Sequence, residues 1–136
     1  MNKNTTLLSL LQRQLSVILT SWGLTSIVMG VTLFFFQVDF LRSMSYQFLI
    51  WGLINFILGI IPLIRNSVPN RSKLYKILLV NSLLDIIYIL VSLLLIFQIL
   101  FEGESSVGHG FGVLIQGLFL LFFDTYYGIK FKNIDD

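Results

Sequence analysis

One acidic residue in the middle of a long apolar stretch is the feature of this sequence best suited to chemistry. Asp85 is the single charged residue of segment 77–101. A carboxyl group near the centre of a membrane helix costs about 2.5–3.5 kcal/mol to insert, so it is normally directed at a partner or a cavity. Such a group can bind a proton, a small ligand or a hydrogen-bond donor. The sequence leaves open whether Asp85 is functional or a structural clasp.

Polar residues at helical spacing accompany Asp85 on its own segment. Asn81, Tyr88 and Ser92 lie four before, three after and seven after it, which places all four on one face of a helix. Asp85 is eight positions into the segment, or ~12 Å below its cytoplasmic end at 1.5 Å per residue. The sequence therefore predicts an intramembrane site around Asp85, with Asn81 and Tyr88 beside it.

A matching polar stripe runs along residues 44–64 at steps of four. Its members are Gln47, Trp51, Asn55 and Gly59. Asn55 lies close to the depth of Asp85, so a hydrogen bond between them across adjacent helices is feasible. The alternative for the amides is helix packing, since small and amide residues join membrane helices at about 0.6 kcal/mol per hydrogen bond.

The last apolar segment, 111–129, carries Gln116 and Asp124, eight residues apart on one helix face. Asp124 is only five positions from the expected cytoplasmic end, so its side chain could reach the interface, and a structural role is favoured for it. Depth separates Asp85 and Asp124 by ~5–7 Å along the membrane normal. A membrane enzyme with both acids in one cavity therefore stays open, although no catalytic motif supports it.

His109 stands among glycines, in Gly108-His109-Gly110-Phe111-Gly112, at the expected outer mouth. Glycines permit unusual backbone angles, which predicts a turn. A lone His beside Glu102 and Glu104 could instead bind a metal weakly or sense pH. The chain has no second His and no Cys, so no metal site and no cofactor are predicted.

Four long apolar segments must position these residues. Hydrophobic residues make up 56% of the chain and charged ones 12%, too few for the exterior of a soluble domain. About 20 apolar residues cross the hydrocarbon core, and the segments are too long for barrel strands. The predicted helical spans are 15–38, 44–64, 77–101 and 111–129. Residues 4–14, with leucines on one face, predict a short interfacial helix.

The distribution of basic residues predicts the orientation. Eight of the nine Lys and Arg side chains fall on one side of the four spans, and they are Lys3, Arg13, Arg65, Arg71, Lys73, Lys76, Lys130 and Lys132. Arg42 alone falls on the other side. By the positive-inside rule both termini are cytoplasmic. With short connections, residues 1–136 are expected to form one antiparallel four-helix transmembrane bundle.

Three short segments combine the residues singled out above. They are Trp51-Gly52-x-Ile54-Asn55, Val80-Asn81-x-x-x-Asp85-x-x-Tyr88, and Gly108-His109-Gly110-x-Gly112 leading into Gln116-Gly117-x-Phe119-Leu120 and Asp124. Together they resemble a family of short, uncharacterised bacterial membrane proteins with four predicted spans. The resemblance implies a multi-pass protein of the bacterial cell (inner) membrane, and it supplies no activity.

The function predicted first is a binding or accessory membrane protein, whose polar interior around Asp85 holds a small ligand, a lipid headgroup or a partner helix. The alternative is a small proton-coupled transporter or channel subunit, which would act as a homo-oligomer because four helices barely enclose a path. Glycine pairs seven apart, Gly23/Gly30 and Gly52/Gly59, would allow close helix approach within or between subunits. The lipid bilayer is the expected partner of the protein, beside a second copy or a partner membrane protein. A net charge of +2 does not indicate nucleic-acid binding.

Overall fold

The computed structural model describes residues 3–65 and 69–134, and four long helices form most of this part of the chain. They are α1 (Lys3–Phe34), α2 (Asp39–Arg65), α3 (Arg71–Ile96) and α4 (Glu104–Lys132). Each is long and apolar enough to cross a membrane. The prediction of an all-α protein with four candidate spans is confirmed.

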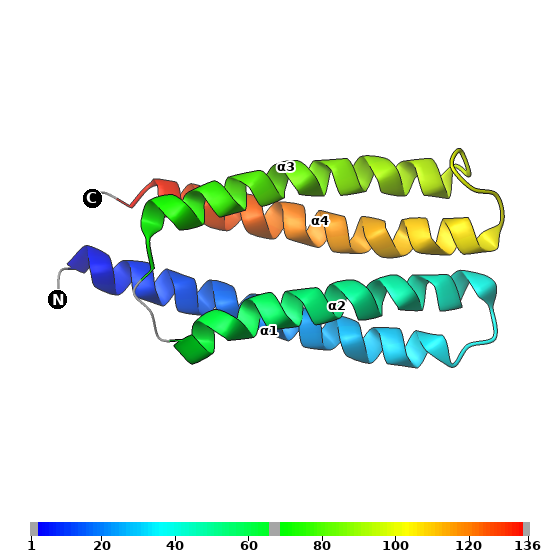
Figure 1. Ribbon diagram of the computed structural model, residues 1–136, viewed down its shortest axis with the longest axis horizontal. Coiled ribbons are helices and arrows are strands. Elements are labelled where there is room, and N and C mark those ends of the chain that lie inside the picture. The colour runs from blue at the N-terminus through cyan, green and yellow to red at the C-terminus, as the bar shows by residue number, and fades with distance from the viewer. Residues whose placement is uncertain (1–2, 66–68, 135–136) are drawn as a thin grey trace.

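The helices are arranged as two antiparallel pairs, α1 with α2 and α3 with α4, and the pairs join mainly where α2 lies against α4 (Figure 1). The start of α1, the end of α2, the start of α3 and the end of α4 lie at one end of the molecule, here termed the terminal end (Figure 1). The two short connections that close the pairs lie at the other end, the hairpin end. Helices α2 and α4 both start at the hairpin end, so they run parallel to each other.

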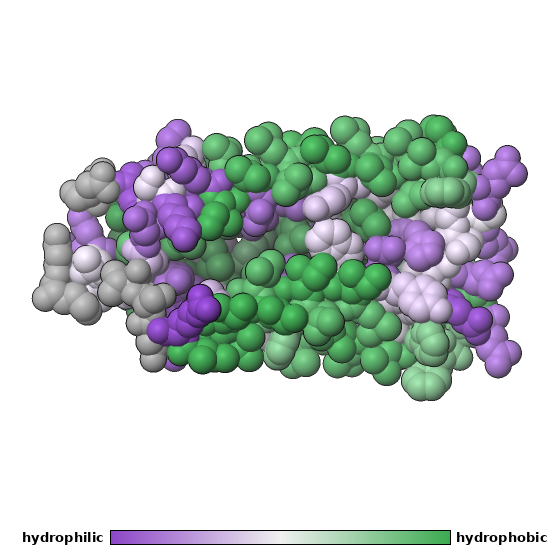
Figure 2. All heavy atoms as spheres, viewed as in Figure 1, coloured by the Kyte–Doolittle hydropathy of each residue, from purple (hydrophilic) through white to green (hydrophobic). Residues whose placement is uncertain are grey.

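The outside of the bundle is apolar along its middle and polar at both ends (Figure 2). Large apolar side chains are exposed on all four helices, among them Leu24, Leu53, Leu83 and Phe122. In water such a surface would be a severe liability. In a bilayer it faces lipid tails of the same polarity, so the exterior fits an integral membrane protein.

Helix α1 is one uninterrupted helix, where a separate interfacial helix over 4–14 was expected before a span over 15–38. No proline or glycine interrupts it before Gly23. Its leucine face continues past the expected junction, because Leu8, Leu11, Leu15 and Leu19 are all buried in one core cluster at the terminal end. Packing of this face within the protein explains why the segment does not lie apart from the bundle.

The other helices differ from the predicted spans mainly at their ends. Helix α3 starts at Arg71, where the Asn70 side chain accepts the backbone N–H of Lys73, an N-cap. It ends at Ile96, because Gln98 takes a left-handed conformation (φ 57°). The start of α3 thus lies in a polar segment before the apolar stretch that begins at residue 77. Hydropathy alone does not predict this part of the helix.

The predicted glycine turn around His109 is wrong, since these residues are helical within α4. The glycines serve a close approach of α4 to α2 instead. A Cβ on Gly108 would meet the carbonyl of Phe40, and one on Gly112 would meet the side chain of Gln47. These glycines allow the two helices to pack closely because they have no side chain, and not because they adopt unusual backbone angles.

Gly23, Gly30, Gly52 and Gly59 perform the same task between α1 and α2. A Cβ on Gly23 or Gly52 would meet the backbone of the facing helix, and one on Gly59 would meet Thr20. These glycines are therefore used inside one chain, so their spacing does not support contacts between subunits.

Candidate functional site

Asp85 on α3 and Asp124 on α4 approach each other in the interior of the bundle, close enough for their carboxyl groups to share a hydrogen bond when one of them is protonated. Asp85 is 2% exposed and Asp124 is 5% exposed. One turn nearer the terminal end, the Thr125 hydroxyl donates to the Ser82 hydroxyl at 3.3 Å, which fixes the register of the two helices. The two acids are here termed the carboxyl pair.

The carboxyl pair has a definite chemical requirement. An ionised carboxylate only accepts hydrogen bonds, so a bond between two carboxyl groups contains a proton supplied by one of them. Oδ2 of Asp85 is buried and has no hydrogen-bond partner in the described part of the chain. Loss of the shared proton would leave two negative charges side by side in a water-poor interior. A hydrogen bond between the two carboxyl groups would therefore require a bound proton.

Asn55 lies inside the bundle, as its place on the polar stripe of α2 predicts, but it does not bond to Asp85. It is 2% exposed, and its Nδ2 has no hydrogen-bond partner among residues 3–65 and 69–134. Helix α3 packs chiefly against α4, so the partner of Asp85 comes from α4. The feasible Asn55–Asp85 bond is replaced by the carboxyl pair.

Gln116 links α4 to α1 through hydrogen bonds from both its amide nitrogen and its amide oxygen. Its Nε2 donates to Oγ of Ser26 at 3.0 Å, and its Oε1 accepts from Nε1 of Trp22 at 2.8 Å. The Trp22 ring also stacks on Phe119, with centroids 3.9 Å apart. Gln116 is thus committed to helix packing, the alternative that the sequence left open for the amides.

Trp51 and Tyr88 form an edge-to-face contact between α2 and α3, with ring centroids 4.9 Å apart. Both side chains are half-buried. Tyr88 lies about one turn from Asp85 toward the hairpin end, and Asn81 about one turn from it toward the terminal end. Asn81 is half-buried too. Tyr88 and Asn81 therefore flank Asp85 along α3, and Trp51 contacts Tyr88 from α2.

His109 lies near the hairpin end, away from the carboxyl pair. Its Nδ1 is 2.9 Å from the amide nitrogen of Gln47, which can donate to it. Its ring lies nearly parallel to that of Tyr46, 6.4 Å between centroids. Among the residues that the structure describes, no group of three or more His, Cys, Asp or Glu side chains could hold a metal ion.

Two residues that the sequence reasoning did not select also matter. Ser16 on α1 is fully buried, and its hydroxyl has no partner within the described ranges. The signal was present, because Ser16, Gly23 and Gly30 are spaced by seven and form one small-residue face. Arg71, read as a basic loop residue, instead donates to the carbonyls of Phe131 and Lys132 at the end of α4.

The comparisons with known proteins agree with a family that has no assigned activity. Residues 18–125 match a family described as "Family of unknown function (DUF6992)". The matched part includes both acids of the carboxyl pair. No curated protein and no solved structure matches the sequence. Because the family match covers well over half of the chain, this protein belongs to the DUF6992 family of unknown function.

Proposed function

We propose that this multi-pass membrane protein is a binding protein whose intramembrane site is the carboxyl pair, and that the site holds a proton. The observation that carries the proposal is the burial of two neighbouring carboxyl groups, Asp85 and Asp124, between the packed helices α3 and α4. Ionisable residues within membrane spans typically mark binding sites or proton relays.

A purely structural clasp would not need two acids. An Asp–Asn pair forms the same hydrogen bond without requiring a shared proton, and the chain uses amides freely elsewhere, as in the Gln116 contacts to α1. Two buried acids instead make the contact dependent on protonation. This dependence is what a proton-binding site has and a packing contact lacks.

The terminal end is proposed to face the cytoplasm of a bacterial cell. Helix α3 starts there with Arg71, Lys73 and Lys76, and helix α4 ends there with Lys130 and Lys132. The positive-inside rule supports this orientation. The carboxyl pair would then be nearer to the cytoplasmic surface than to the outer one.

Infrared difference spectroscopy on the purified protein in nanodiscs tests the proposal. A change from acid to alkaline pH should remove a protonated-carboxyl band in the wild type, and Asp85→Asn and Asp124→Asn should each abolish that change. Asp39→Asn is the matched control, because Asp39 is exposed at the hairpin end. If both interior variants keep the wild-type difference band, the carboxyl pair does not hold the proton.

A second candidate function is proton-coupled transport by a homo-oligomer. It is favoured by two further buried polar atoms without partners in the described ranges, Oγ of Ser16 and Nδ2 of Asn55. Such atoms are commonly satisfied by buried water, which could extend a proton path beyond the carboxyl pair. Proteoliposomes with an imposed pH gradient test this. Proton flux that Asp85→Asn abolishes supports transport, and flux that is absent while the infrared band is present leaves binding as the function.

A further inference from the structure

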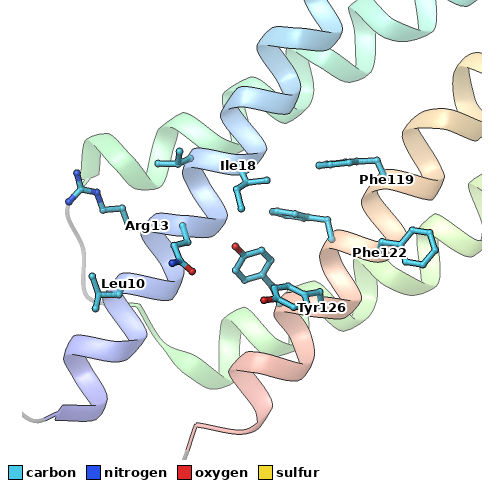
Figure 3. A pocket seen from close by; sticks show the side chains of 10 residues that line it. Leu10, Arg13, Ile18, Phe119, Phe122 and Tyr126 are labelled. Atoms are coloured by element: carbon cyan, nitrogen blue, oxygen red, sulfur yellow. The ribbon is translucent and has the colours of Figure 1, made fainter.

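A groove of about 960 Å³ opens on the side of the bundle between α1 and α4 (Figure 3). This volume is near the upper end of typical ligand sites, about 300–1,000 Å³. It exists because α1 packs on α2 and α4 packs on α3, while α1 and α4 touch each other only sparingly. The stacked rings of Trp22 and Phe119 mark the limit of the groove toward the hairpin end.

The walls of the groove change from apolar to polar along its length. Val17 and Ile18 on α1 and Phe119 and Phe122 on α4 line its deeper part, and Figure 3 shows Ile18 and Phe119 facing each other across it. Toward the terminal end the lining includes Arg13, Gln14 and two tyrosines, beside the apolar Leu10. This order follows the polarity of a lipid molecule, with its tails toward the bilayer centre.

Two cationic groups stand at the terminal end of the groove. Arg13 contributes to the lining and is exposed, and Figure 3 shows its guanidinium group on the side of α1 away from α4. Lys130 lies over the ring of Tyr126, with its Nζ 4.7 Å from the ring centroid, and Tyr126 lines the groove. Among residues 3–65 and 69–134, no Asp or Glu lines the groove. Guanidinium and ammonium groups are the side chains that bind phosphate oxygens best.

We propose that this groove binds one anionic glycerophospholipid. Its phosphate is held at the rim by Lys130 and by Arg13, whose exposed side chain turns toward the groove when the lipid binds, and an acyl chain lies against Val17, Phe119 and Phe122. A second copy of the chain fits less well, because a two-fold contact through the groove would bring the same cationic rim of both copies together. The proposal does not depend on the carboxyl pair.

Fluorescence quenching of Trp22 tests the proposal, because Trp22 stacks on the groove residue Phe119. A Trp51→Phe background leaves Trp22 as the single tryptophan. Reconstituted in phosphatidylcholine nanodiscs, it should be quenched more strongly by a low fraction of brominated phosphatidylglycerol than by the same fraction of brominated phosphatidylcholine. Arg13→Gln and Lys130→Gln should each lower this preference about fivefold, since a basic residue near the surface contributes about 1 kcal/mol.

Lys73→Gln is the matched control, because Lys73 is exposed at the terminal end but lies outside the groove. This variant loses one positive charge, as Arg13→Gln and Lys130→Gln do. Its quenching should equal that of the background protein. Equal quenching by the two brominated lipids in the background protein would overturn the proposal, and so would a loss of preference in Lys73→Gln as large as in Arg13→Gln.

Native mass spectrometry adds a readout that does not depend on headgroup charge. Val17→Trp fills the groove and should lose the bound phosphatidylglycerol, whereas Val28→Trp, an exposed position of α1 outside the groove, should retain it. Both positions are exposed, so neither variant disturbs the core. Retention of the lipid by Val17→Trp would contradict the proposal, and a dimer that Val17→Trp dissociates would assign the groove to a second copy.

Discussion

A hydrogen bond between the buried carboxyl groups of Asp85 and Asp124 would require a shared proton, so substitution of either acid tests the proposed site. We predict that Asp85→Asn is as stable as the wild type or more stable, because its amide donates to Asp124 without a shared proton. Asp85→Ala should lose about 1–3 kcal/mol, since it leaves the Asp124 carboxyl buried without a partner. Thermal unfolding in detergent measures both variants.

The same measurement repeated from acid to alkaline pH separates a proton site from a clasp. The wild type should lose stability as the pH rises, because withdrawal of the shared proton leaves two carboxylates facing each other. Asp85→Asn should show little of this dependence. A variant clearly less stable than the wild type at every pH would instead identify Asp85 as a structural clasp.

Gln116 offers a contrasting prediction, because its two bonds to α1 need no proton. Gln116→Met keeps the volume and removes both bonds, which should cost about 1 kcal/mol at about 0.6 kcal/mol per bond in a membrane protein. The emission of Trp22 should shift as its Nε1 loses its acceptor. Gln12→Met is the control, because Gln12 is half-buried on α1, the helix to which Gln116 bonds. This variant should change neither the stability of the protein nor the emission of Trp22.

The sequence predicts which residues lie in the interior better than it predicts which of them meet. Periodicity and depth select Asp85, Asn55 and Gln116, and all three are at most 2% exposed. The partner of Asp85 was not predictable, because depth arguments place residues along the membrane normal only. Which helices are neighbours decides the lateral contacts, and α3 packs chiefly against α4.

At the scale of the helices, glycines determine how closely α2 and α4 approach. Gly108→Ala should destabilise the protein by about 1–3 kcal/mol, because its Cβ would meet the backbone of Phe40, which cannot move aside as a side chain can. Gly128→Ala, on the same helix, meets only an ordinary contact 3.7 Å away at Leu78. It should be neutral or up to about 1 kcal/mol stabilising through helix propensity.

Thermal unfolding of these two α4 variants, with helix content from circular dichroism, checks the argument. Equal effects at both glycines would mean that helix propensity outweighs the approach to α2. The comparison also explains why a turn was predicted at residues 108–112. A glycine run has the same local sequence whether it serves backbone freedom or a close contact, and only the facing helix distinguishes the two uses.

Helix number and approximate length were predictable, because the bilayer thickness imposes about 20 apolar residues on each span. The helix ends were less so, since α4 starts at Glu104, in a polar stretch before the apolar one. The continuity of α1 also required tertiary knowledge. Leu8 and Leu11 could cover a membrane surface or a protein core, and the core cluster with Phe131 decides for the latter.

At the scale of the whole molecule, helix α1 starts and helix α4 ends at the same end of the bundle (Figure 1). The orientation in the membrane is therefore defined by which side of the membrane this terminal end faces. Eight of nine Lys and Arg residues belong to that terminal end or to the adjoining helix segments. Charged loops of this kind are retained in the cytoplasm. We therefore predict that the terminal end is cytoplasmic and the hairpin end is external.

Single cysteines test this orientation directly, because the chain has none of its own. Glu102→Cys places a thiol at the hairpin end and Ser72→Cys places one at the terminal end, and both positions are exposed. A membrane-impermeant maleimide should label Glu102→Cys in intact bacteria, but Ser72→Cys only after the membrane is permeabilised. The reverse pattern would place Arg13 and Lys130 on the outside, and the anionic lipid proposed for the groove would then have to come from the outer leaflet. Equal labelling of both variants in intact cells would indicate two opposite insertions, which the eight-to-one distribution of basic residues makes physically unfavourable.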